Sequence, residues 1–246
     1  MWSNFTTLAW PAVRELLDGG HEMLVLPCGA TEQHGAHLPI NTDTVIGQAV
    51  CAYACEKAKV PLLPPLAYTV SVGHTTKWPG TFSLSHETFI ATVCEIADWA
   101  ERTGWKRLLV VNSHFGNDAS LRVAVDKVRT SRMGTFQVGT QNTFNLTPEI
   151  WAEFISDAED LHANKSETDL MLHLAPESVD MEAAEDDPDR TIGKVFSYPV
   201  AQTSKHGLTG KPSLGSTADG KALFEKMGNA LAALLETAKT ETPPTL

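Results

Sequence analysis

The fold class is decided by residues 107–112, RLLVVN, an apolar run that ends in an asparagine. The polar loop SHFGN follows at residues 113–117. A short apolar run bounded by a polar loop predicts a strand that is buried on both faces. Residues 23–27, MLVLP, form a second such run, which ends in Cys28 and Gly29. The sequence therefore predicts two buried strands, each followed by a loop.

Helical patterns lie between and after these strands. They span residues 43–59, with Asn41 or Thr42 as the N-cap, residues 85–102, with Ser85 as the N-cap, and residues 118–130, ahead of a third strand at 135–139. Strands and helices that alternate from residue 22 to about 140 predict an α/β fold, with a mostly parallel sheet covered by helices on both faces. Ligands bind such sheets at the carboxyl ends of the strands, so we expect the chemistry there.

The remaining segments complete one domain. Further helices are expected at residues 167–174 and 220–240, an extended segment at the proline-rich residues 60–66, and a solvated loop at the acidic residues 180–190. Neither an internal repeat nor a linker divides the sequence. We therefore expect residues 1–246 to form a single domain.

Composition excludes several classes of function. The 19 Lys and Arg against 30 Asp and Glu give a net charge of −11, and an acidic surface disfavours nucleic acid as a partner. The sequence has no run of about 18 apolar residues, so no membrane span is expected. It begins without a basic segment followed by an apolar stretch, and its four cysteines form no paired CxxC motifs. These features predict a cytoplasmic protein without a thiolate zinc site.

The first cluster of reactive side chains lies in residues 29–43, GATEQHGAHLPINTD. Glu32 and His34 are two residues apart, so both face the same side of an extended segment. A turn at Gly35 would bring Asp43 to the same place. Zn²⁺, Mn²⁺ and Fe²⁺ accept such mixed oxygen and nitrogen ligands, and a carboxylate can bridge two ions that lie about 3.5–4 Å apart. The alternative is that these side chains only cap the loop.

The second and third clusters supply further candidates. His114 directly follows the strand at 107–112, so it is a candidate ligand, or alternatively a loop histidine bonded to a carbonyl. Ser113 as a nucleophile with His114 as its base is less favoured, because adjacent residues of an extended chain point apart. Glu167 begins an expected helix and can reach a metal, and His162 titrates near neutral pH and can transfer protons. His74 could line the pocket or lie on the surface.

These motifs resemble the creatininase (creatinine amidohydrolase) family. Residues 26–44 are similar to its opening motif, and residues 112–117 to its second motif, which is usually Asn-Gly-His-Gly-Gly-Asn. The segments that complete the resemblance are residues 73–74 and 79–84, His162-Ala163 with Glu167-Thr168, and residues 207–212 with 220–221. The similarity extends from about residue 8 to residue 237.

The resemblance implies a three-layer α/β/α sandwich and a centre of two divalent ions, with Zn²⁺ preferred and Mn²⁺ or Fe²⁺ as alternatives. By this resemblance Glu32, Asp43 and His114 hold one ion, and His34 and Asp43 hold the other, with Asp43 bridging. Creatininase itself has a glutamate where this chain has Gly116, so Glu167 is our candidate for the missing ligand. His162 matches the family's proton-transfer histidine. The candidate substrate-binding residues are His74, Trp78, Ser113, Phe115, Gly116 and Asn117. A homo-oligomer is expected, with a hexamer as the form that the family suggests.

The expected reaction is hydrolysis of a C–N bond in a small cyclic or linear amide. A hydroxide that bridges two ions would attack the carbonyl, the ions would hold the oxyanion, and His162 would protonate the leaving nitrogen; Glu167 is a second catalytic candidate. Creatinine is not the first expectation, because we find no tryptophan close after His162. The alternatives are a formamide deformylase or a peptide-trimming member of the family, a non-catalytic metal-binding scaffold, and a metal-free hydrolase with Ser113 as nucleophile.

Overall fold

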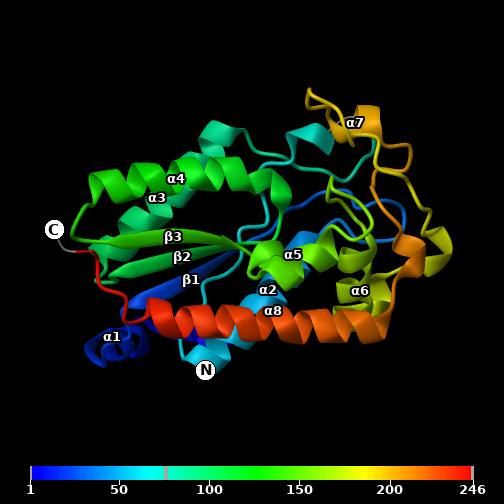
Figure 1. Ribbon diagram of the computed structural model, residues 1–246. Helices are drawn as coiled ribbons and strands as arrows, with labels where there is room; N and C mark the ends of the chain where they lie inside the picture. Colours follow the sequence, from blue (N-terminus) through cyan, green and yellow to red (C-terminus); the bar gives the residue numbers. More distant parts are fainter. Residues whose placement is uncertain (1, 75–76, 245–246) are drawn as a thin grey trace.

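The computed structural model describes residues 2–74 and 77–244. Within these residues, three parallel strands form one sheet in the order β1 (Met23–Cys28), β2 (Arg107–Asn112) and β3 (Gln137–Asn142) (Figure 1). Cys28 lies opposite Asn112, and Asn112 lies opposite Asn142. The three strands therefore end level with one another, and the loops that follow them meet at one edge of the sheet.

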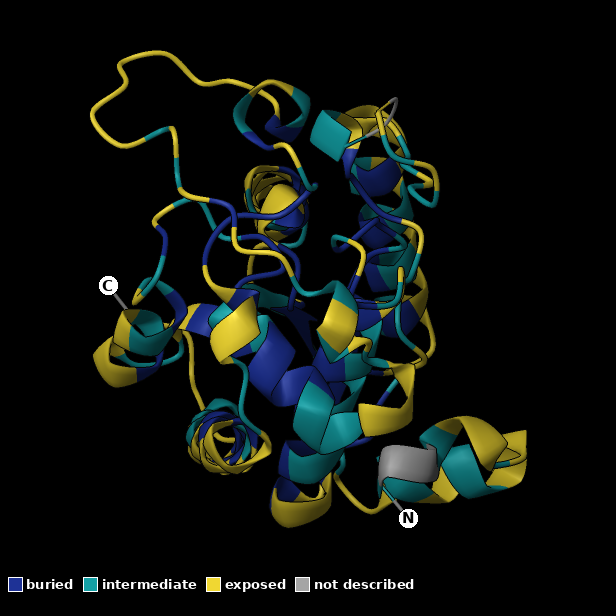
Figure 2. Ribbon diagram, turned by 90° about the vertical axis from the view of Figure 1, so that its right-hand side faces the viewer, coloured by how far each residue is buried: buried dark blue, intermediate teal, exposed yellow. Residues whose placement is uncertain are grey.

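Helices cover both faces of this sheet. Because side chains alternate along a strand, Leu108 and Val110 pack with α3 (His86–Arg102) and α4 (Asp118–Ser131). Leu109 and Val111 point the other way and pack with α2 (Thr42–Ala58), α6 (Lys165–Leu174) and α8 (Thr217–Ala238). Figure 2 looks onto the carboxyl ends of the strands and shows the buried segments gathered in the middle. The expected α/β/α sandwich with a parallel sheet is confirmed.

Other elements were not predicted from the sequence. They are the helices α1 (Trp10–Asp18), α5 (Pro148–Phe154) and α7 (Val200–Thr203), and the short 3-10 helices η1 (Trp2–Thr7), η2 (Val72–His74), η3 (Phe115–Asn117), η4 (Thr143–Asn145), η5 (Pro176–Ser178), η6 (Met181–Ala183) and η7 (Pro212–Leu214). The proline-rich segment is extended as expected, with bridges from Leu62 to Val25 and from Leu66 to Cys28. Within the described ranges, every helix is too short or too polar to cross a membrane.

Several expected boundaries were wrong for local reasons. The third strand runs from Gln137 to Asn142 instead of 135–139, because the amides of Thr135 and Phe136 still donate to the Arg132 carbonyl in the turn that ends α4. Helix α6 begins at Lys165, since the Asn164 side chain caps it by accepting the amide hydrogen of its third residue. Helix α8 spans Thr217–Ala238 instead of 220–240, because the Ser216 hydroxyl caps it three residues earlier than expected.

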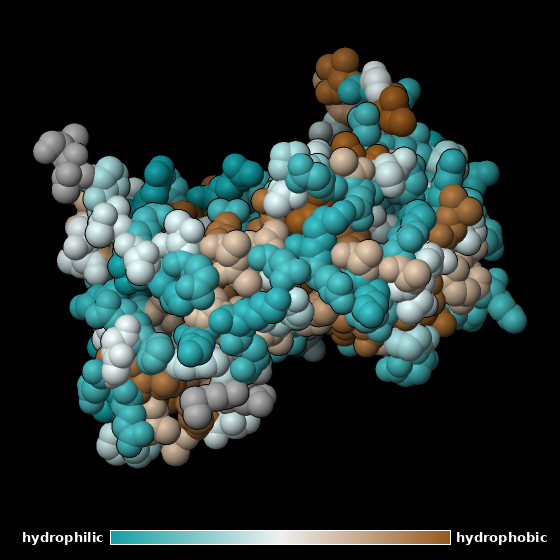
Figure 3. Space-filling model, turned by 60° about the horizontal axis from the view of Figure 1, so that its bottom comes forward, coloured by the Kyte–Doolittle hydropathy of each residue, from teal (hydrophilic) through white to brown (hydrophobic). Residues whose placement is uncertain are grey.

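The acidic segment 180–190 is not a fully solvated loop. Asp187 is buried, and its carboxylate accepts hydrogen bonds from the Ser204 hydroxyl at 2.8 Å and from the Lys205 amide at 2.7 Å. These bonds anchor the chain before it projects outward in residues 191–199. Val195 and Phe196 of this projection are 91% and 75% exposed, and Figure 3 shows apolar side chains on the protrusion that Figure 1 places beside α7.

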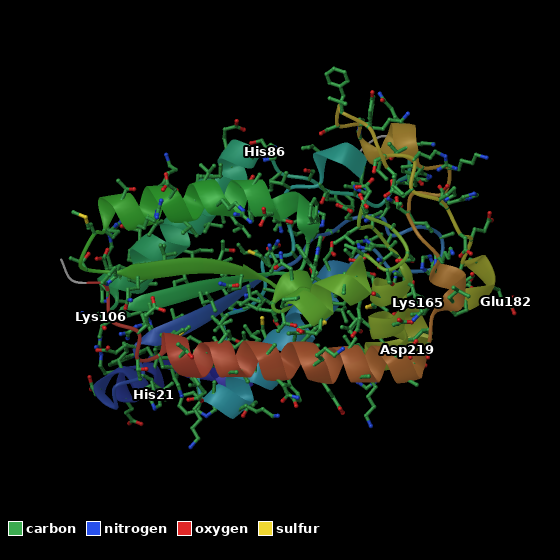
Figure 4. The ribbon with its side chains drawn as sticks, viewed as in Figure 1. His21, His86, Lys106, Lys165, Glu182 and Asp219 are labelled. Carbon is green, nitrogen blue, oxygen red and sulfur yellow. The ribbon has the colours of Figure 1, made fainter. Side chains whose placement is uncertain are left out.

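An ion-pair network ties α6 to α8. The Lys165 ammonium lies 2.6 Å from the Asp169 carboxylate on its own helix and 2.8 Å from the Asp219 carboxylate on α8 (Figure 4). The Asp169 carboxylate also accepts from the Ser216 amide, just ahead of α8. These contacts hold in place the start of α6, which carries Glu167 toward the sheet edge.

Candidate metal centre

A cavity of about 220 Å³ opens at the carboxyl edge of the sheet. Reactive side chains reach it from the loop after β1, the first turn of α2, η2, the loop after β2 and the turn that leads into α6. The sequence-predicted residues that line it are Glu32, Asp43, His74, Ser113, His114, Phe115, Gly116, His162 and Glu167. His34 adjoins it, with its Nε2 3.4 Å from Asp43 Oδ1. Side chains far apart in the sequence therefore meet at the place where the parallel sheet predicts a ligand site.

Glu32, Asp43 and His114 form the first group of possible metal ligands, with one atom of each within 4.8 Å of the others. His114 Nε2 lies 2.9 Å from the Val70 carbonyl oxygen, which can only accept, so His114 Nε2 carries the hydrogen. His114 Nδ1 then faces Asp43 Oδ2 at 3.1 Å. An outer hydrogen bond that fixes one ring nitrogen and leaves the other facing the site is typical of histidine ligands.

Asn112 shapes the loop that carries His114. Its side-chain oxygen accepts the His114 amide hydrogen at 3.1 Å, and its side-chain nitrogen donates to the His114 carbonyl at 2.8 Å. The same nitrogen lies 2.9 Å from the Asn142 side-chain oxygen at the end of β3. The last residue of β2 thereby holds His114 over the sheet edge.

His34, His162 and Glu167 form the second group of possible ligands. His34 Nδ1 lies 2.9 Å from the Glu32 carbonyl oxygen, so Nδ1 donates and Nε2 faces Asp43. Asp43 lies in the first turn of α2, and its two oxygens point toward different groups: Oδ1 toward His34 and Oδ2 toward His114. The carboxylate therefore stands between the two groups.

The buried polar atoms of this cluster fit a cation. Glu32 Oε1 and Oε2, His34 Nε2 and Asp43 Oδ2 are buried without a well-formed hydrogen bond to any residue that the structure describes. Unsatisfied buried polar atoms are costly and rare in native proteins. A divalent ion would satisfy all of them, and carboxylate oxygens with imidazole nitrogens are the ligands that such ions accept.

The charges within the cluster act strongly on one another. Burial disfavours protonated His34, but the Asp43 carboxylate outweighs it and raises the pKa of His34 to about 10. Burial likewise disfavours protonated His114, but the Glu32 and Asp43 carboxylates outweigh it and raise the pKa of His114 to about 9. Burial also disfavours ionised Asp43, yet the charges on His34 and His114 hold its pKa well below the usual range. Metal binding must therefore displace protons from this cluster.

Glu167 has a structural contact as well as a place beside His34. One of its carboxylate oxygens accepts the amide hydrogen of Ala163, a non-glycine residue in the left-handed region with φ of 47°. Burial raises the pKa of Glu167 to about 7 even though the charge of His34 opposes the rise. The position fits both a metal ligand and a brace for the turn that precedes α6.

His162 lies on the turn that Glu167 braces. Burial and the neighbouring His74 lower the pKa of His162 well below its usual range. His162 Nδ1 lies 3.2 Å from Glu32 Oε1, and the Thr209 amide donates to the His162 carbonyl at 2.8 Å. Residues 207–212 therefore support the His162 turn. The neutral imidazole of His162 belongs to the group of His34 and Glu167, and to a third group of possible ligands with Glu32 and His74.

One wall of the cavity is apolar and was missed by the sequence analysis. Phe144 and Phe154 line it with Tyr198, Val200 and the expected Phe115. The ring centroids of Phe115 and Phe144 are 5.8 Å apart. Phe144 and Phe154 come from η4 and α5, beyond β3, where no polar motif indicated a site.

Gly116 is required beside His114. A Cβ atom on Gly116 would lie 2.5 Å from His114 Nε2 and 2.8 Å from the Val70 carbonyl oxygen, closer than real contacts allow. A larger residue in this backbone would displace His114.

Two expected substrate-binding residues are absent from the described lining of this cavity. Trp78 lies in a separate pocket with Pro79 and Glu185, where Lys77 covers its ring. Asn117 is fully buried; its side chain accepts from the Val70 amide at 3.1 Å and donates to the Gly29 carbonyl at 2.9 Å. Neither side chain is placed to meet a substrate in the cavity.

The other polar residues near the loops have structural contacts. The Ser113 hydroxyl lies 2.7 Å from the Asp43 carbonyl and donates to it, which leaves it poorly placed to act as a nucleophile. His37, for which the sequence suggested no role, is buried, and its Nε2 lies 2.9 Å from the Thr168 hydroxyl. That hydroxyl donates its hydrogen to the Asn164 carbonyl, so His37 Nε2 is the donor in this bond. His37 thus ties the opening motif to α6, and its place in that motif was the available signal.

Comparisons with known proteins find relatives that match nearly the whole chain. A family model described as creatinine amidohydrolase matches residues 6–235. The chain is 28% identical to the creatinine amidohydrolase of Pseudomonas putida, over 97% of this chain and 96% of the relative. It is 30% identical to the mycofactocin precursor peptide peptidase of Mycolicibacterium smegmatis, over 85% of this chain and 83% of the relative. A solved creatininase with Mn superposes with a TM-score of 0.82 at 26% identity, covering 95% of this chain and 97% of the other. The resemblance expected from the motifs is confirmed.

Proposed function

We propose, from the premise that this chain belongs to the creatininase family and is a metal-dependent amidohydrolase, that it hydrolyses a C–N bond of a small cyclic or linear amide at a centre of two divalent ions. The observation that carries the proposal is the buried cluster of carboxylate and imidazole atoms left without hydrogen-bond partners among the described residues. The cluster lines a cavity at the strand ends, where a substrate can reach it.

Asp43 would be shared by both ions, since its two oxygens face different ligand groups. Glu32 and His114 would complete one position, and His34 and Glu167 the other; His162, the third member of the second group, is assigned to proton transfer instead. Zn²⁺ is the ion we expect first, with Mn²⁺ or Fe²⁺ as alternatives that the same atoms accept. Divalent ions in such a site lower the pKa of water to about 7 and polarise a carbonyl oxygen.

The side chains around the cluster would do the rest. His162 is neutral and presents Nδ1 beside Glu32, so it can take a proton from the attacking water and return it to the leaving nitrogen. Phe115, Phe144 and Phe154 offer an apolar wall against which a small ring or an aliphatic group can pack. The cavity of about 220 Å³ fits a small amide, or the end of a peptide, better than a folded polymer.

The relatives leave open which amide is hydrolysed. One is named for creatinine and another for a peptide precursor, and a formamide remains an alternative substrate. Of the rival functions, the metal-free hydrolase is disfavoured by the Ser113 hydroxyl, which donates to a backbone carbonyl. The single domain, the cytoplasmic location and the homo-oligomer, with a hexamer as the suggested form, stay predictions.

The test is a screen of small cyclic amides, imides, formamides and short peptides before and after metal removal. We expect hydrolysis of at least one class, its loss after treatment with EDTA, and its return with Zn²⁺ or Mn²⁺. The Ser113→Ala variant should keep most of the activity. Activity that survives complete removal of metal would contradict the proposal, and a metal-loaded protein inert toward every class would favour the scaffold.

A further inference from the structure

We propose that Gln33 is a positioning residue that fixes which ring nitrogen of His74 and of His162 carries hydrogen, so that His162 presents a bare Nδ1 to the metal centre. Gln33 is 4% exposed and lies in the chain between Glu32 and His34. Its backbone carbonyl and its side-chain amide both contact imidazole rings. Only the catalytic consequence rests on the proposed function; the hydrogen positions follow from contacts within the chain.

The orientation of the Gln33 amide is set by two backbone groups. The Gly35 amide donates to Gln33 Oε1 at 3.0 Å, and Gln33 Nε2 donates to the Gly207 carbonyl at 2.7 Å. Turning the amide over would set its oxygen against the Gly207 oxygen and its nitrogen against the Gly35 amide. The nitrogen of Gln33 is therefore the atom that faces the two histidines.

The hydrogen on His162 follows from the Gln33 backbone. His162 Nε2 lies 2.9 Å from the Gln33 carbonyl oxygen, which can only accept. His162 Nε2 therefore carries the hydrogen of the neutral ring. His162 Nδ1 is left with a lone pair, 3.2 Å from Glu32 Oε1.

The hydrogen on His74 follows from the Gln33 side chain. The amide nitrogen has two hydrogens, and one goes to the Gly207 carbonyl. His162 Nε2, at 3.0 Å, is itself a donor and cannot accept the other. The second hydrogen therefore goes to His74 Nδ1 at 2.9 Å, which leaves the His74 hydrogen on Nε2, facing Glu32 Oε1 at 3.3 Å.

The reverse assignment fails within the described residues. If His162 Nε2 had no hydrogen, it would face the Gln33 carbonyl lone pair to lone pair. The Gln33 amide would then donate its second hydrogen to His162 Nε2, and His74 Nδ1 would have no donor. The first arrangement gives His74 Nδ1 its donor, and it leaves lone pairs facing each other only between His162 Nδ1 and Glu32 Oε1, at the metal centre, where a cation would accept both.

The experiment measures ¹⁵N spectra of metal-free protein with ¹⁵N-labelled histidine at neutral pH, with His74→Gln and His162→Gln to assign the two signals. In the unaltered protein we expect hydrogen on Nε2 of both rings. In Gln33→Glu, the ionised side chain offers His74 only an acceptor oxygen, so the His74 hydrogen should move to Nδ1. His162 should stay unchanged, because the backbone carbonyl remains.

A second variant guards against misfolding of Gln33→Glu. Gly207 has φ of 78°, and a Cβ there would collide with Gln33 Oε1, so Gly207→Ala should loosen the amide and give His74 a mixture of both forms. Gln202→Glu, at an exposed position of α7, is the matched control and should change neither signal. Hydrogen on Nδ1 of His162 in the unaltered protein, or His74 unchanged in both Gln33→Glu and Gly207→Ala, would overturn the hydrogen assignment.

The catalytic consequence is measured separately on metal-loaded protein. Gln33→Glu should lower kcat by roughly 10–100-fold, the usual effect of losing an outer partner of a metal site, with little change in KM. An unchanged kcat together with a shifted His74 hydrogen would overturn the catalytic role while leaving the hydrogen positions intact. Because the spectra need no turnover, they remain decisive if the unaltered protein hydrolyses none of the amides tested.

Discussion

Replacing Glu167 by glutamine should weaken one metal position and leave the other intact. Glutamine has nearly the same size, and its side-chain oxygen can still accept the Ala163 amide hydrogen that Glu167 accepts. The turn before α6 should therefore survive, and the change removes one negative charge beside His34. Losing an outer partner of a metal site costs 10–100-fold in affinity, so losing a direct ligand should cost at least about 100-fold, or about 2.8 kcal/mol.

The assay titrates metal-free protein with Zn²⁺ against a competing chelator. Unaltered protein should bind two ions, and Glu167→Gln should bind one as tightly and the second at least about 100-fold more weakly. Glu177→Gln, on an exposed carboxylate of η5, is the matched control. His162→Ala should keep both ions while turnover falls by roughly 10²–10⁴-fold. If Glu167→Gln bound two ions tightly and His162→Ala lost one, the roles would be exchanged: His162 would be the ligand and Glu167 the proton-transfer group.

Three further outcomes follow from the same geometry. Asp43→Ala should lose both ions, as measured by elemental analysis, and nearly all activity. If the variant kept both ions, the bridging ligand would be a residue other than Asp43. Gly116→Ala should displace His114, because the added Cβ would collide with His114 Nε2. The ion held by His114 and Glu32 should then bind less tightly in the chelator titration. Unaltered binding of that ion would show that the collision does not occur. The raised pKa values of His34, about 10, and His114, about 9, mean that both carry protons at pH 7 without metal. The apparent affinity for the divalent ions should therefore rise from pH 6 to 8, by up to about 100-fold per pH unit if metal binding releases both protons. Calorimetry that finds neither this rise nor proton release would contradict the prediction.

The layers of the fold could be predicted because the two apolar runs, residues 23–27 and 107–112, carry their own signal. Each run is buried on both faces and has helical patterns around it, and such a pattern admits few arrangements other than a parallel sheet. β3 was harder to place. Its side chains are mostly half-buried, so no apolar run marks where it begins and ends.

The polar half of the site could be predicted because most of its ligand residues lie in the motifs that follow β1 and β2. The apolar half could not, since Phe144 and Phe154 belong to short elements whose position depends on packing over the sheet edge. Trp78 and Asn117 were expected in the site because they lie close to the motifs in the sequence. A polar or aromatic residue beside a motif can as easily support a loop as face the cavity, and the sequence does not separate these two fates.

The most direct test of a two-ion hydrolytic centre is a stepwise metal titration with activity measured after each addition. The protein should be stripped of metal, shown to be folded, and given Zn²⁺ or Mn²⁺ in fractions of one equivalent per chain while hydrolysis of a responsive amide is followed. We predict two tightly bound ions per chain, with full activity reached only as the second position fills. A folded protein that binds no divalent ion, or one that hydrolyses the amide at full rate before any ion is added, would contradict the centre described here.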